Sequence, residues 1–323
     1  MSGSMFNRFA PDGERRARDA EDDASGTVFA PRSVGSVAGV TEAEVLAGVD
    51  RVPALPLVVT RLLALVGDDL SSASDMESLI SQDMVIAGKL LKLVNSPFYG
   101  LSNEIRSLPQ AVAIIGFASL RSLVLAASTA DILDVRIRAY GFLEHGLWLN
   151  AMATGCVARE IAQATGHDNE TADEYFVAGL LRDVGMLALG PIYQRLGIVL
   201  AERMGDDGDL LKAERHSIGF DHCWAGERVA EKWQLPEVLA FVVGRHHRIP
   251  QHCQDHALRL LASVRLAERL VCKACVGLEA EHPFRTSVDG VLLGASGLSV
   301  TAFRDLVARI PEIVAQAQAE GLA

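Results

Sequence analysis

Apolar residues recur every three or four positions along most of the chain, the spacing that places them on one face of a helix. Alternation of apolar and polar residues, the pattern of a half-buried strand, never continues for more than a few positions. The sequence therefore predicts an all-α fold. The predicted helices cover residues 57–66, 85–94, 109–115, 120–130, 143–164, 172–189, 192–204, 223–232, 236–246, 257–276 and 301–319.

The start of the chain lacks this periodicity. Residues 1–40 mix charges of both signs with Gly, Ser and Pro, which predicts a disordered tail. Thr41 and Glu44 then have the spacing of a capping box, in which side chain and backbone satisfy each other's unpaired donors. A second box, Ser74 with Glu77, is predicted to open another helix. Order is therefore expected to begin at Thr41.

The helices beyond the tail are predicted to form a core domain and an extension. The core domain covers residues 41–250. An N-terminal helical lobe at about 41–131 packs on a second helical lobe at about 132–250. Residues 251–323 follow as a C-terminal helical extension.

Composition and charge narrow the class of protein. Half of the 323 residues are hydrophobic, enough for a sizeable core. The 30 Lys and Arg residues against 41 Asp and Glu give a formal charge of −11, which disfavours nucleic acid as a partner. The five cysteines are scattered and no signal segment precedes them, which favours a reducing cytoplasm. The most apolar stretch, 108–130, contains Arg121, so we expect a core helix there and no membrane span.

Histidines are concentrated in one part of the chain. Six of the nine fall within 41 residues, and histidine is the commonest protein ligand of transition metals. Surface helices also carry histidines that bind nothing, so the clustering alone leaves both interpretations open. His246 and His247 are chain neighbours, so both can face one ion only where the helix ends, and Pro250 follows shortly after. The six are His216, His222, His246, His247, His252 and His256.

One acidic residue stands out because its surroundings are apolar. Asp183 lies inside the stretch 178–187, which is otherwise rich in Leu, Val, Gly and Ala. A carboxylate in such surroundings is either desolvated and paired or placed to hold a cation. Asp183 is therefore a candidate site residue.

The cysteines give a weaker signal. Cys272 and Cys275 form a C-x-x-C with no second pair nearby, within a predicted helix, which favours ordinary thiols over a zinc site. A metal bound by His252, Cys253 and His256 is likewise a weaker interpretation than a polar loop.

Several segments of the chain form a recognisable ordered pattern: 55–56, 82–84, 89–100, 105–116, Trp148, 179–185, 214–222, 233–236 and 246–247. Together they closely resemble the HDOD domain, a bacterial signalling relative of the HD metal-dependent phosphohydrolases. The resemblance covers roughly 200 residues in order, from about Val52 to His247. It implies a helical HDOD fold in which the second lobe is a degenerate HD-like lobe.

The resemblance also implies where a metal centre would lie. HD phosphohydrolases hold one or two divalent ions with an early His, a His-Asp doublet, later histidines and a last Asp. In this chain the early position is Asn150, the doublet reads Arg182-Asp183, and the last position is Glu268, a conservative replacement. The residues that match the ligand pattern by type are Asp183, His222, His246 and His247.

Arg182 stands where the family pattern has a histidine, and this difference determines which function we expect. A guanidinium stays protonated and has no lone pair for a metal, so it brings positive charge to the place of a cation. Arg182 is expected to pair with Asp183 or with Glu268 in place of a metal. We therefore expect loss of the dinuclear centre and no cofactor. The alternative left open is a single Mn, Fe, Ni or Zn ion held by Asp183, His222 and one of the two later histidines.

Three functions are weighed on these grounds. The first is a non-catalytic signalling or scaffolding module, whose partner is a protein or small signal in bacterial regulation. The resemblance implies cyclic-di-GMP or two-component proteins as such partners. The second is a metal-dependent phosphohydrolase or phosphodiesterase with a reduced metal site. The third, a nucleic-acid-associated regulator, is disfavoured by the acidic charge. The oligomeric state is left open.

Overall fold

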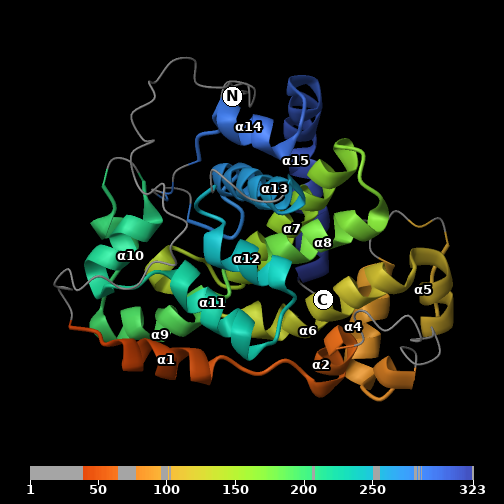
Figure 1. The fold of residues 1–323 in the computed structure, drawn as a ribbon, viewed down its shortest axis with the longest axis horizontal. Coiled ribbons are helices and arrows are strands. Elements are labelled where there is room, and N and C mark those ends of the chain that lie inside the picture. The colour runs from red at the N-terminus through yellow and green to blue at the C-terminus, as the bar shows by residue number, and fades with distance from the viewer. Residues whose placement is uncertain are drawn as a thin grey trace.

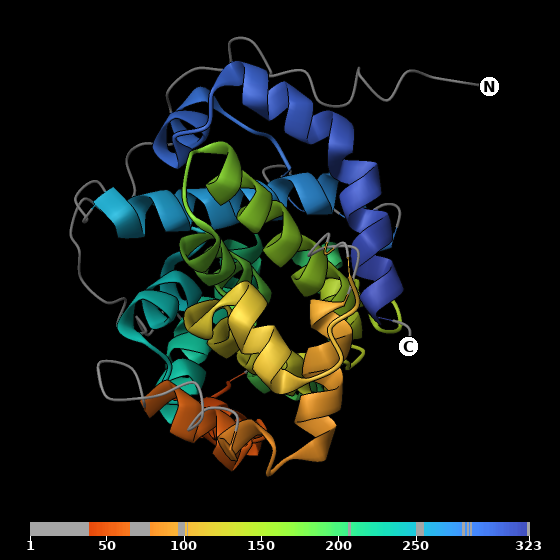
Figure 2. The same cartoon turned by 90° about the vertical axis from the view of Figure 1, so that its right-hand side faces the viewer.

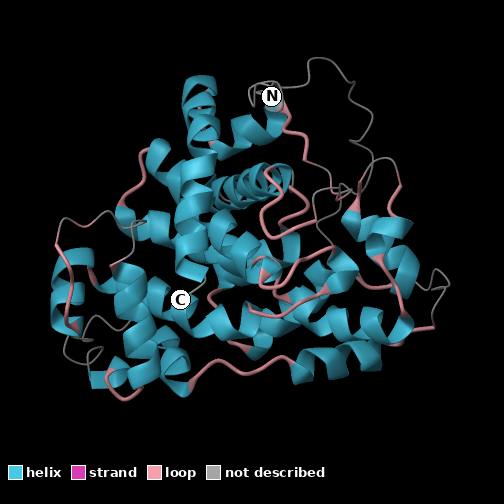
Figure 3. Ribbon diagram, turned by 180° about the vertical axis from the view of Figure 1, so that it is seen from behind, coloured by secondary structure: helices cyan, strands magenta, loops and turns pink. Residues whose placement is uncertain are grey.

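The structure is a computed structural model in which helices joined by loops make up the described chain (Figure 1). The described residues contain no strand, and the one extended pairing among them is an isolated bridge between Phe142 and Leu278 (Figure 3). The predicted all-α fold is confirmed. The described residues are 39–64, 78–95, 101, 103–205, 208–249, 255–279, 282, 284 and 286–321.

The helices follow in chain order, with two short 3-10 helices, η2 and η3, among them. They are α1 (Glu42–Arg51), α2 (Leu57–Ala64), α4 (Met84–Val94), α5 (Leu108–Ile115), α6 (Phe117–Leu133), η2 (Arg138–Tyr140), α7 (Gly146–Ala164), α8 (Asn169–Leu181), α9 (Gly185–Leu196), η3 (Leu200–Arg203), α10 (Leu210–Ile218), α11 (His222–Lys232), α12 (Glu237–Arg245), α13 (Asp255–Lys273), α14 (Gly290–Ser296) and α15 (Val300–Gly321).

The capping box predicted at the start of the core domain is confirmed. The Thr41 hydroxyl accepts from the backbone N–H of Glu44, and the Glu44 carboxylate accepts from the backbone N–H of Thr41 at 2.9 Å. Val40 is already buried, so packing begins one residue earlier than predicted. The second predicted box, Ser74 with Glu77, lies outside the described residues, as do His252 and Cys253.

Two predicted helix boundaries are wrong. The helix predicted at 172–189 is interrupted, because residues 182–184 form a turn between α8 and α9. The helix predicted at 192–204 ends early, because Gly197 adopts the left-handed conformation at φ 62 and closes α9. The first of these breaks lies in the interior, where Arg182 and Asp183 are buried.

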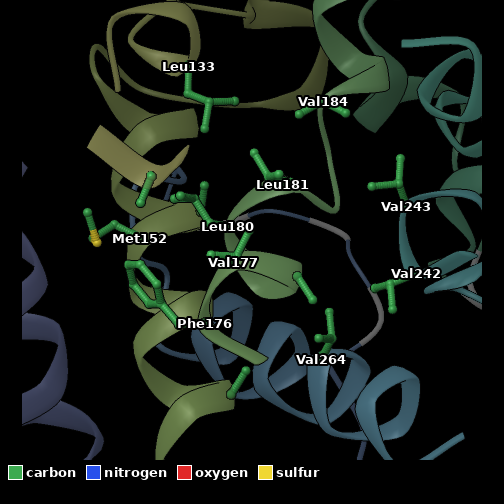
Figure 4. Packing of buried hydrophobic residues seen from close by; sticks show 14 of the residues in the cluster. Leu133, Met152, Phe176, Val177, Leu180, Leu181, Val184, Val242, Val243 and Val264 are labelled. Carbon is green, nitrogen blue, oxygen red and sulfur yellow. The ribbon is translucent and has the colours of Figure 1, made fainter. Parts of the chain in front are cut away.

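Helix α7 forms the middle of the core, where α8, α13 and α15 pack against it. Figure 4 shows Phe176, Val177 and Leu180 of α8 beside Met152 of α7. The two helices approach closely at glycine, because a Cβ on Gly179 would lie 2.9 Å from the Cα of Gly155. Each large apolar side chain buried here contributes about 1.5–3 kcal/mol. This packing holds the turn at 182–184 from one side.

Helix α1 lies against α9 and α11, apart from α2 and α4 (Figure 1). The Lys232 ammonium secures its end by donating to the carbonyls of Val49, Asp50 and Val52 at 3.1, 2.7 and 2.6 Å. The first helix of the predicted N-terminal lobe therefore contacts the second lobe. The lobe boundaries themselves stay a prediction.

The C-terminal helix α15 packs along α7 and α13 (Figure 2). Arg309 donates to both carboxylate oxygens of Glu160 at 2.8 and 3.1 Å, which joins α15 to α7. The segment 169–196, made of α8, the turn at 182–184 and α9, is long and apolar enough to span a membrane, but 89% of its apolar window is buried inside the protein. The helix pair 290–296 and 300–318 also passes that test together, with a bend of 96°.

Replacing Gly185 with alanine is expected to lower the free energy of unfolding by about 1–3 kcal/mol, the usual cost of overpacking. A Cβ there would lie 1.9 Å from the backbone oxygen of His222 and 2.6 Å from the backbone nitrogen of Gly226, so α9 and α11 would have to separate. Urea unfolding measures the change. The control is Gly88→Ala on α4, where no atom lies within 4 Å and helix propensity favours alanine by about 0.5–1 kcal/mol. Equal stability of the two variants would contradict this packing.

Candidate functional site

Three chain segments meet at the candidate site. The turn between α8 and α9 carries Asp183, α11 begins at His222, and α12 ends just before His246 and His247. One donor atom from each of these four residues lies within 4.8 Å of all the others. Helix α12 ends at Arg245, within one residue of the end predicted at 246. His246 and His247 therefore lie beyond the helix, and both face the same point.

Three of the donor atoms have the spacing of a metal coordination shell. Asp183 Oδ1 lies 3.2 Å from His246 Nε2 and 3.5 Å from His222 Nε2. The two Nε2 atoms are 3.3 Å apart. Tetrahedral ligands with zinc-like bond lengths are separated by about 3.3–3.6 Å. These three atoms therefore fit a single divalent ion.

The opposite ring nitrogens of the two histidines are already engaged. His222 Nδ1 lies 2.7 Å from Glu214 Oε2, and His246 Nδ1 lies 3.1 Å from the backbone oxygen of Val243. Both acceptors require a proton on Nδ1, which leaves the lone pair of each neutral ring on Nε2. Two lone pairs 3.3 Å apart need a cation between them, either a proton or a metal ion.

Glu214 is a residue of the candidate site that the sequence did not single out. It is fully buried on α10, a helix that the apolar pattern does not predict. Besides His222, it accepts from the Tyr140 hydroxyl at 2.5 Å. The sequence held one signal that could have identified Glu214, because it is the first residue of the segment 214–222 that matches the family. Because Glu214 is fixed from two sides, it orients the His222 ring.

Arg182 sits beside this cluster with its guanidinium engaged on three sides. Nη2 lies 2.8 Å from Asp183 Oδ2 and also donates to Asn150 Oδ1, while Nη1 donates to the carbonyl of Gly179 at 2.8 Å. Burial raises the pKa of Asp183, but the Arg182 guanidinium together with His246 and His222 outweighs it and holds that pKa well below the usual range. Of the two partners predicted for Arg182, the structure places Asp183 in contact with it.

The cluster is closed to solvent. Asp183 is 3% exposed, Arg182 1%, and His222 and His246 are not exposed at all. A substrate phosphate would have to reach Asp183 Oδ1 through the side chains that cover it. The arrangement suits a buried, fixed centre better than an open catalytic one.

The remaining predicted site residues lie at the edge of the cluster or away from it. Glu268 does not contact the three donors; its Oε2 accepts from Arg265 at 3.1 Å, and its Oε1 lies 3.7 Å from His247 Nε2. Burial and the Arg265 charge hold the pKa of His247 well below its usual value. Elsewhere, His256 is exposed and pairs with Glu174 at 2.8 Å.

The C-x-x-C motif is placed differently from the prediction. Helix α13 ends at Lys273, so Cys275 lies in the following turn with a positive φ of 56°, not inside the helix. Cys272 is buried, and burial raises the pKa of its thiol to about 12. A neutral, buried thiol is a poor metal ligand.

The stability of the metal-free protein should fall as pH rises through about 9. Burial lowers the pKa of His246, but the Cys223 sulfur and Asp183 raise it from 6.5 to a net value of about 9. Because the folded pKa exceeds the unfolded one, the contribution is complete below pH 6.5 and is lost as pH rises through about 9, roughly 3 kcal/mol in all. Urea unfolding between these pH values measures it. The same slope in a His246→Gln variant would contradict the assignment.

The HDOD domain family model matches residues 52–249 of the chain. An HDOD domain protein of unknown function from Geobacter sulfurreducens superposes with a TM-score of 0.69 at 26% identity, covering 87% of this chain and 97% of that one. A Shewanella amazonensis SB2B protein provisionally named a phosphohydrolase superposes with a TM-score of 0.65 at 21% identity over 86% and 97%. An uncharacterized protein of Treponema pallidum (strain Nichols) is 27% identical over 256 residues, 78% of this chain and 48% of that protein. The chain thus spans about half the length of this curated relative.

Proposed function

Because the chain belongs to the HDOD domain family, we propose that it is a non-catalytic signal-transduction or scaffolding module in bacterial regulation. The observation that carries the proposal is the buried guanidinium of Arg182, which is bound to Asp183 and Asn150. Arg182 and Asn150 occupy the positions that the family resemblance assigns to two histidine ligands. The residues present therefore do not fit a dinuclear centre.

Charge supports the same conclusion. A second divalent ion beside Asp183 would face the Arg182 guanidinium at about 4 Å, where repulsion amounts to about 4 kcal/mol for each unit of charge at an effective dielectric near 20. Asp183 Oδ2 is already engaged by that guanidinium at 2.8 Å. The centre therefore holds at most one ion.

The second candidate is a metal-dependent phosphohydrolase with a reduced site, favoured by the three donor atoms of Asp183, His222 and His246. These residues would hold one divalent ion, whose chemistry is to generate a hydroxide nucleophile from bound water near neutral pH. Glu214 would orient His222 through Nδ1. The burial of all three ligands argues against turnover, because a substrate needs an open coordination position.

We further propose that the partner is a protein or a small signal, with cyclic-di-GMP or two-component proteins as the first to test. The family resemblance supports this choice, and the acidic charge argues against nucleic acid. We also propose a cytoplasmic location, on the scattered placement of the five cysteines in the sequence. A pull-down from the source cell identifies the partner.

One assay separates the two candidate functions. Purified protein is expected to contain at most one Mn, Fe, Ni or Zn ion per chain and to hydrolyse no generic phosphodiester. The matched variant is Asp183→Ala, which removes the shared carboxylate. Turnover that depends on added metal and disappears in Asp183→Ala would establish the phosphohydrolase and overturn the scaffold proposal.

A further inference from the structure

We infer that Arg265 withholds His247 from any metal at this centre, so that an ion there has only Asp183, His222 and His246 as protein ligands. The inference rests on the proposed function in one respect, the limit of one ion at the centre. Arg265 lies outside the predicted ligand pattern. By this inference it nevertheless sets how many protein ligands an ion at the centre would have.

The contact between Arg265 and His247 fixes the position of the ring proton. Arg265 Nη1 reaches from α13 to within 2.5 Å of His247 Nδ1. An arginine N–H can only donate, so His247 Nδ1 must accept with its lone pair. A neutral imidazole has a single ring proton, which must then lie on Nε2. The Nδ1 lone pair is then engaged by Arg265 and Nε2 carries a proton, so neither nitrogen of His247 has a free lone pair for an ion.

The other two histidines have the opposite arrangement. Their Nδ1 atoms face acceptors, the Glu214 carboxylate for His222 and the Val243 carbonyl for His246. In its neutral form each ring therefore has its lone pair on Nε2, from which a metal ion would displace any bound proton. Although all three rings gather within 4.4–5.2 Å of one another, only two are in the tautomer that binds a metal through Nε2.

Glu268 holds this arrangement in place. Glu268 lies about one helical turn after Arg265 on α13. Its Oε2 accepts from Arg265 Nη1, the same nitrogen that contacts His247, at 3.1 Å. Its Oε1 lies 3.7 Å from His247 Nε2 and favours a proton there. The Arg265 and Glu268 side chains are 13% exposed and that of His247 is 10% exposed, so the three form a largely desolvated unit. Low exposure strengthens each of these charged contacts.

The first test reads the tautomers in the metal-free full chain. Long-range ¹⁵N–¹H spectra are expected to show His247 protonated on Nε2 alone, and a proton on Nδ1 of both His222 and His246, whose Nε2 atoms share the proton that the metal-free centre holds. A proton on Nδ1 of His247 would overturn the inference. This readout needs no metal and no activity, so it stands or falls independently of the proposed function.

The second test uses Zn²⁺ alone, titrated against a chelating dye. Replacing Arg265 with methionine keeps the length of the side chain and removes the donor, so His247 can turn its lone pair to the ion. The Zn²⁺ affinity is expected to rise at least tenfold, within the range of outer-shell effects on metal sites. In the double variant Arg265→Met with His247→Ala, that gain should disappear.

The charge control is Arg245→Met on α12. Arg245 pairs with Glu227 at 3.1 Å and makes no contact with His247 that the structure records, so its loss removes the same charge without freeing a ligand. An equal gain in Arg245→Met and Arg265→Met, or a gain that persists in the double variant, would mean that charge alone is responsible and would overturn the inference.

Discussion

Replacing Arg182 with alanine is expected to lower the free energy of unfolding by about 3–5 kcal/mol, the loss found when one member of a buried ion pair is removed. The variant would leave Asp183 buried beside an empty space, and it would remove the donor to Asn150 Oδ1 and to the Gly179 carbonyl. Urea unfolding in the presence of a chelator measures the effect without rescue by metal.

The matched control is Arg195→Ala on α9. Arg195 pairs with Glu44 at 2.9 Å, but the two side chains are 56% and 41% exposed, and such solvent-exposed pairs contribute about 0–1 kcal/mol. Similar losses in the two variants, each below about 1 kcal/mol, would show that the Arg182 guanidinium does not neutralise the buried carboxylate. The structural basis of the scaffold proposal would then be gone.

Restoring both missing histidines should create a second metal position. The double variant Asn150→His with Arg182→His removes the fixed positive charge and supplies two donors beside Asp183. We expect metal content to rise from at most one ion per chain to two. Affinity should strengthen at least a hundredfold, about 2.7 kcal/mol, which is less than the charge repulsion that the variant removes.

The control for this experiment is Asn150→His alone, in which Arg182 still engages Asp183 Oδ2. The single variant should gain little affinity, because the charge remains. If the double variant bound metal no better than the parent, the placement of Asn150 and Arg182 at ligand positions would be wrong.

Local signals in the sequence were sufficient to predict the all-α fold. The box at Thr41 and Glu44 marked the first helix, and apolar periodicity found α13 and α15 within a few residues. The same periodicity continued across residues 182–184, where the chain turns. Apolar spacing does not distinguish one long buried helix from two shorter ones, because the helices on both sides of the turn, α8 and α9, face the core.

The sequence could predict which residues belong to the candidate site, but it could not predict how they contact one another. Residue type and order selected Asp183, His222 and His246, since these follow the family pattern. The choice of Arg182's partner between Asp183 and Glu268 depended on distances between helices, which local sequence does not encode. The acceptors of the ring protons, Glu214 and the Val243 carbonyl, were likewise set by tertiary packing.

Ring tautomers give the clearest example of that limit. His246 and His247 are adjacent and identical in type, yet one faces a carbonyl and the other a guanidinium. The spacing of Arg265 and Glu268 on one face of α13 is visible in the sequence as an i, i+3 pair. Its orientation toward His247 follows only from the packing of α12 on α13.

The central claim is that a fixed positive side chain occupies the place of an ion. A crystal structure of metal-supplemented protein, with anomalous scattering recorded at the absorption edge of the added metal, tests it directly. The account predicts the Arg182 guanidinium on Asp183 and no more than one anomalous peak, between Asp183, His222 and His246. Two peaks bridged by Asp183, with Arg182 turned away into solvent, would contradict it.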